Sequence, residues 1–132
     1  MRDTAHTFED TGRYEDAISQ FDKATKLNPG RAYTHNVLCW TLKEMGKSAE
    51  AIEACKKAIA VDPSYKGAYR NLGIIYSGTG RLEDAIAALK KALEIDPNYL
   101  SAHDQLAGIY QKQGRTDEAK KHFRIIEELG KR

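Results

Sequence analysis

The sequence predicts an all-α fold in which short helical hairpins stack on one another into a solenoid. The first observation is a 34-residue interval, because prolines lie at positions 29, 63 and 97 and glycines recur at 12, 46, 80 and 114. The second is that apolar residues within each interval are three and four apart, as in an amphipathic helix. In such arrays each hairpin buries its apolar face against its neighbours.

The interval divides the 132-residue chain into one domain with repeats at 1–31, 32–65, 66–99 and 100–132. The first repeat lacks its opening residues, and Thr4 stands where later repeats have leucine. We therefore expect its first helix, about residues 2–11, to be short and frayed, with Gly12 in the place of the turn glycine. Met1 would then lie inside a longer array.

The second repeat shows how each hairpin is predicted. Leu38, Leu42 and Met45 form one apolar stripe, and Gly46 supplies a residue that can adopt a positive φ after the first helix. The second helix carries its own stripe, formed by Ala51, Ile52, Cys55, Ala58 and Ile59. The pair Asp62-Pro63 ends it, because proline lacks a donor and disfavours a helical residue before it.

Alanines recur at the 34-residue interval where two helix axes must approach closely. They are Ala17, Ala51, Ala85 and Ala119. A larger side chain there would wedge the helices apart. We expect Ala85→Leu to be among the most damaging single substitutions.

The last repeat departs from the others at its second helix. Lys120 and Glu127 stand where earlier repeats have mostly apolar residues, which predicts that the array ends with this sequence. Ile125 and Leu129 nevertheless leave some apolar surface there. This surface either mediates dimerisation or is a fringe covered by its own hairpin, so the chain is expected to be a monomer or a weak homodimer.

The repeat pattern resembles the tetratricopeptide repeat family over almost the whole chain. The third copy carries the family's spacing most completely, at Tyr69, Leu72, Gly73, Tyr76, Ala85, Leu89, Ala92 and Pro97. His35 and Cys39 replace a large aromatic and a small residue in the second copy, and His103 takes the aromatic position in the fourth. The resemblance implies a right-handed superhelix whose first helices line a concave groove.

The candidate partner-binding residues are those expected to face this groove. They are Tyr33, Asn36, Val37, Trp40 and Lys43, then Arg70, Asn71, Ile74 and Ser77, then Ser101, Asp104, Gln105, Gly108 and Gln111. Trp40 is either an anchor for an apolar side chain of a peptide or a space-filler against the first repeat. Asn36 and Asn71 are expected to hold a peptide backbone through their amides.

The clamp that some family members use for a partner's C-terminal carboxylate is disfavoured. Its positions here hold Arg2, His6, Val37, Gly67 and Asn71, of which only Arg2 fits that role. Arg70 could still meet an acidic ligand.

Composition narrows the function classes. A net charge of +2 lacks the concentrated positive field of a nucleic-acid-binding protein. No leader-like segment and no long apolar stretch is present, so we expect a soluble, cytoplasmic protein without membrane association. Cys39 and Cys55 lie within helical patterns, which predicts free thiols in a reducing compartment.

Catalysis is not expected. His35 and Cys39 lie one helical turn apart, but both fall in packing positions, and the two cannot complete a metal site. The segment Ser77-Gly78-Thr79-Gly80 lacks the strand and lysine of a phosphate-binding loop. We predict a scaffold without cofactor or metal that binds an extended peptide or helix of another protein, with self-assembly through terminal repeats as the alternative.

Overall fold

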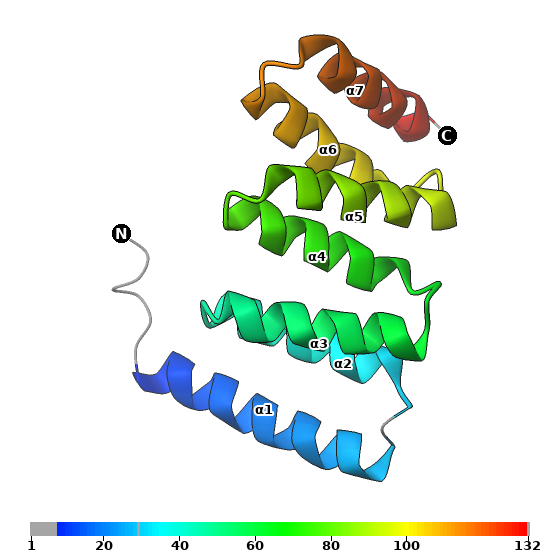
Figure 1. Ribbon diagram of the computed structural model, residues 1–132. Coiled ribbons are helices and arrows are strands. Elements are labelled where there is room, and N and C mark those ends of the chain that lie inside the picture. The colour runs from blue at the N-terminus through cyan, green and yellow to red at the C-terminus, as the bar shows by residue number, and fades with distance from the viewer. Residues whose placement is uncertain (1–7, 29, 132) are drawn as a thin grey trace. The chain divides into compact units, whose positions relative to one another are not determined.

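The computed structural model describes residues 8–28 and 30–131, and this part of the chain contains helices and no strand (Figure 1). The helices are α1 (Phe8–Leu27), α2 (Ala32–Glu44), α3 (Ser48–Val61), α4 (Lys66–Gly78), α5 (Leu82–Ile95), α6 (Leu100–Lys112) and α7 (Thr116–Gly130). The predicted all-α class is confirmed. Thr4, Arg2 and His6, whose roles were considered from their positions in the first repeat, lie outside the described residues.

The helices belong to two compact units, residues 1–63 and 64–132, and each is considered by itself. In the first unit α2 packs against α3 and against α1. In the second, α4 pairs with α5 and α6 pairs with α7, while α6 also contacts α4 and α5. The expectation that residues 1–132 form a single domain stays a prediction.

Three of the four repeat glycines make the predicted turns. Gly46, Gly80 and Gly114 have φ values of 80°, 81° and 74°. At the first of these turns the Gly46 amide donates to the Lys43 carbonyl over 3.0 Å, and the Lys47 amide donates to the Leu42 carbonyl over 2.9 Å. These bonds satisfy carbonyl groups left over at the end of α2, as expected for a helix end capped by glycine.

The turn expected at Gly12 is wrong, because α1 continues through this residue as one helix. The predicted separate helix over residues 2–11 is therefore not formed within the described part, which begins at Phe8. A glycine permits a left-handed turn but does not impose it. Continuing the helix retains backbone hydrogen bonds that a turn would have to replace.

Small residues lie at the centres of the hairpins, as the sequence predicts. Ala51, Ala85 and Ala119 are buried. Gly73 is required by close packing, since a Cβ atom at this position would lie 2.6 Å from Cγ of Leu89. The antiparallel hairpin thus brings positions 16 residues apart into contact.

The expectation of two free thiols is wrong, because Cys39 and Cys55 form a disulfide. Both are fully buried, and their Cα atoms are 5.2 Å apart. Their separation of 16 residues equals that between Gly73 and Leu89, so they occupy facing positions of α2 and α3. The argument from free thiols to a reducing compartment therefore loses its support.

Candidate functional site

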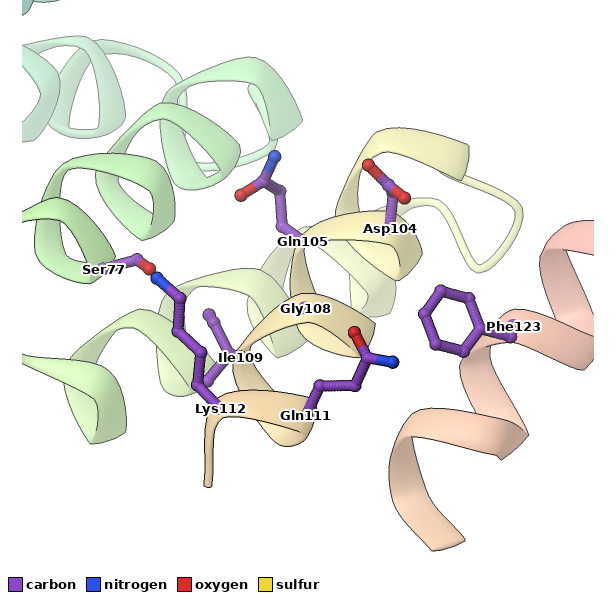
Figure 2. Close-up of a pocket in the computed structure, with 8 residues that line it drawn as sticks. All are labelled: Ser77, Asp104, Gln105, Gly108, Ile109, Gln111, Lys112 and Phe123. Carbon is purple, nitrogen blue, oxygen red and sulfur yellow. The ribbon is translucent and has the colours of Figure 1, made fainter. Parts of the chain in front are cut away.

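A pocket with a volume of about 340 Å³ opens between α4, α6 and α7 of the second unit (Figure 2). We call it the α6 pocket, because α6 supplies most of its lining. Its lining residues are Ser77, Asp104, Gln105, Gly108, Ile109, Gln111, Lys112 and Phe123. Ser77 comes from the last turn of α4, and Phe123 comes from α7.

One face of α6 carries opposite charges at its two ends. Asp104, Gly108 and Lys112 follow one another at four-residue spacing, which places them on the same side of a helix. Figure 2 shows Gly108 between the two charged side chains. Asp104 and Lys112 are exposed, and neither has an ion-pair partner within the described part of the chain.

Gly108 is not required by the packing of the protein itself. A Cβ atom built there would meet no atom within 4 Å, in contrast to the close contact at Gly73. A glycine inside a helix costs about 0.5–1 kcal/mol relative to alanine. The glycine therefore leaves the floor of the pocket open without benefit to the fold.

Phe123 forms the wall of the pocket on the side of α7, and 41% of its surface is exposed. It occupies the position that Leu89 has in the preceding repeat, where leucine is fully buried against Gly73. The residue 16 positions before Phe123 is Ala107, which is larger than glycine. A phenyl ring opposite alanine cannot sink into the hairpin as deeply as leucine opposite glycine.

A pair of histidines joins α6 and α7 beside this wall. Nε2 of His103 donates to the Pro97 carbonyl over 2.8 Å, so its Nδ1 accepts from Nδ1 of His122 over 2.9 Å. Burial lowers the pKa of His122 below its usual 6.5, and the nearby His103, Lys121 and Lys90 lower it further. Because His122 precedes Phe123, this bond helps to fix the wall.

Of the predicted groove residues of α4, Ser77 lines the α6 pocket, whereas Arg70, Asn71 and Ile74 do not. Arg70 Nε donates to Ser101 Oγ over 2.7 Å, and its Nη1 donates to Asn71 Oδ1 over 2.9 Å. Asn71 is only 4% exposed, so its amide oxygen is engaged inside the protein rather than presented on the surface. Ile74 is half-buried. Arg70 thus ties α4 to α6.

The predicted residues of α2 belong to the first unit. Tyr33 is 62% exposed, and Asn36, Val37, Trp40 and Lys43 are half-buried. The Lys43 ammonium lies 4.4 Å from the centre of a Trp40 ring, and it donates to Glu44 over 3.0 Å. The Trp40 ring therefore has a cation at its face.

The sequence therefore located part of the pocket. Of the predicted residues, the pocket brings together Ser77, Asp104, Gln105, Gly108 and Gln111. Lys112, Ile109 and Phe123 were missed. Lys112 could have been found from its four-residue spacing after Gly108, and Phe123 from the 16-residue pairing within hairpins.

His35 and Cys39, the pair considered for catalysis, have surroundings that differ from those of a catalytic thiol and its base. His35 is buried, and the sulfur of Cys39 is in the disulfide.

Within residues 8–28 and 30–131, no cluster of three or more His, Cys, Asp or Glu side chains has the arrangement of a metal site. No helix in this part of the chain combines the length and apolar character of a bilayer-spanning segment.

Comparison with protein families accounts for the repeats. Sequence profiles described as tetratricopeptide repeat match residues 5–31, 67–99 and 88–121, and one described as TPR repeat matches residues 41–80. The chain belongs to the tetratricopeptide repeat family. The predicted family and its solenoid fold class are confirmed.

Solved structures of MamA are similar to this chain. A crystal structure of MamA is 30% identical, with a TM-score of 0.84 over 94% of this chain and 72% of that one. MamA from Desulfovibrio magneticus RS-1, residue 41 to the end, is 28% identical, with a TM-score of 0.80 over 93% and 70% of the two chains. A comparison with curated protein sequences gave no match. The tetratricopeptide repeats and these neighbours support a role as a protein-interaction scaffold.

Proposed function

We propose that this scaffold holds an extended peptide or a helix of another protein in the α6 pocket. The observation that carries the proposal is the open floor at Gly108 beside the exposed ring of Phe123. An aromatic wall over an unfilled hollow suits an apolar side chain of a partner, and such anchors often dominate the energy of an interface.

The other residues that line the α6 pocket suit the binding of a partner better than catalysis. Gln105 and Gln111 offer amide donors and acceptors, and Ser77 offers a hydroxyl. The described lining residues do not place a nucleophile next to a base, which is the arrangement that covalent catalysis needs. We therefore infer a binding module rather than an enzyme, with a protein as its partner.

A selection from a random peptide library tests the proposal. Selected peptides titrated into the ¹⁵N-labelled protein should shift the amide resonances of Gln105, Gly108 and Gln111. Phe123→Ala should weaken binding by about tenfold or more, since anchors of this kind contribute about 2 kcal/mol. Leu27→Ala in α1, which is also exposed, is the control and should not change affinity. Peptides that shift only resonances outside the pocket would refute the proposal.

The first unit offers a second aromatic surface at Tyr33 and Trp40 on α2. We expect Trp40→Ala to weaken capture of a partner while leaving helicity and the thermal midpoint nearly unchanged. Circular dichroism and pull-down of the same two proteins check this. A large loss of stability would instead assign Trp40 to packing.

Self-assembly is the second candidate function, favoured by a hollow of about 370 Å³ on α7. Its lining combines apolar Ile125 and Leu129 with Lys121, Arg124 and Glu128. Charges of both signs around an apolar centre suit a self-complementary contact. Sedimentation over a concentration series would show a dimer that Ile125→Lys abolishes, whereas a monomer at every concentration would leave the α6 pocket as the favoured interface.

A further inference from the structure

We infer that the α6 pocket recognises an extended segment in which a basic, an apolar and an acidic side chain alternate with solvent-facing residues. The inference rests on the proposed function and specifies the chemistry of the partner. It follows from charge and spacing along α6.

The spacing of α6 matches that of an extended chain. Asp104, Gly108 and Lys112 are four residues apart in turn, which corresponds to about 6 Å of helix rise per step. Side chains on one face of a β-strand are two residues apart, or about 6.6 Å. Three alternate side chains of a strand lying along α6 therefore stay in register with these three positions.

The charges of Asp104 and Lys112 determine which side chains of the ligand are favoured at the two ends of this face of α6. Asp104 favours a cation, and Lys112 favours an anion. Neither charge is neutralised by an ion pair within the described residues, so a ligand does not have to displace an existing partner. The middle side chain meets the open surface of Gly108 and the ring of Phe123, which favours an apolar residue.

The amides of the pocket favour an extended segment over a helix. Gln105 and Gln111 flank Gly108 along α6 and can pair with the exposed N–H and C=O groups of an extended peptide. A helix offers few such groups, since its backbone bonds are satisfied internally. An extended segment therefore uses more of the lining.

Three synthetic peptides with blocked ends test the inference by NMR titration of the intact protein. The strand-spaced peptide is Gly-Lys-Ser-Leu-Ser-Glu-Gly, and its control of identical composition is Gly-Ser-Lys-Leu-Glu-Ser-Gly. In the control, an extended chain turns both charges away from the leucine face. The third, Lys-Ala-Ala-Ala-Leu-Ala-Ala-Ala-Glu, has helical spacing. We expect the strand-spaced peptide to bind about fivefold or more tightly than either.

Charge variants give the second arm of the experiment. Asp104→Lys and Lys112→Asp should each weaken the strand-spaced peptide about fivefold. The double variant should recover most of the affinity, because the peptide can bind in the opposite chain direction. Glu127→Lys and Lys120→Glu make comparable charge changes at exposed positions of α7 outside the pocket, and they should have no effect.

The outcomes separate the inference from the proposed function. If all three peptides bind equally and shift the Gly108 amide, the inference is overturned and the proposed function stands. If the helically spaced peptide binds most tightly, the extended geometry is overturned. If peptides, including those from the library, fail to shift pocket resonances, both are overturned.

Discussion

Ala85 lies on α5, and its side chain is fully buried, as expected for a position where two helices must approach closely. We predict that Ala85→Leu lowers the free energy of unfolding by about 1–3 kcal/mol, because the added carbons must displace packed neighbours. Chemical denaturation measures this. Ala87→Leu, on the exposed side of the same helix, is the matched control and should change stability by less than about 0.5 kcal/mol. Equal effects of the two substitutions would contradict the packing argument.

We predict that His122 makes stability depend on pH. Burial, together with His103, Lys121 and Lys90, lowers the pKa of His122 in the folded protein, while Glu118 opposes the shift. The unfolded chain therefore takes up the proton first, so stability should be full above pH 6.5 and fall as pH drops from 6.5 toward the lowered pKa. His122→Gln should reduce this fall in denaturation curves recorded between about pH 7.5 and about pH 5.5. An unchanged pH profile in the variant would show that His122 is not responsible.

At the scale of helices, the Cys39–Cys55 bond links α2 to α3 across 16 residues. Closing a loop of about this length contributes about 3 kcal/mol by restricting the unfolded chain. We predict that reduction speeds hydrogen exchange of the α2 and α3 amides more than that of α6. The variant Cys39→Ala/Cys55→Ala should exchange equally in the presence and absence of reductant. Alkylation of two thiols in the untreated native protein would contradict the pairing.

The helices and their turns could be predicted from sequence because both depend on nearby residues. Apolar spacing identifies the buried face of each helix, and Gly46, Gly80 and Gly114 mark the turns. The turn predicted at Gly12 was wrong because a glycine only permits a turn, and the local sequence does not reveal whether a helix continues through it. The disulfide was missed because the two cysteines were assessed on separate helices, without the register of 16 residues that pairs them.

At the scale of the whole molecule, the sequence predicted the family and part of the candidate site. Repeat alignment placed Asp104, Gln105 and Gly108 on one helix face, and all three line the α6 pocket. It could not reveal that Asn71 is buried and accepts a hydrogen bond from Arg70, because that depends on a contact between two side chains. It also missed Phe123, because the exposure of this side chain depends on the size of the residue opposite.

The central claim is that the hollow above Gly108 is kept open for a ligand, and Gly108→Leu tests it most directly. Leucine favours a helix by somewhat less than 1 kcal/mol over glycine, so the thermal midpoint should stay the same or rise. Gly73→Ala should instead destabilise the protein, because its new Cβ would collide with Leu89.

The deciding measurement is the affinity of the Gly108→Leu protein for a library-selected peptide, with its thermal midpoint recorded on the same sample. We predict a loss of affinity of about tenfold or more without loss of stability. Unchanged affinity in a stably folded variant would show that the hollow is not where the peptide binds.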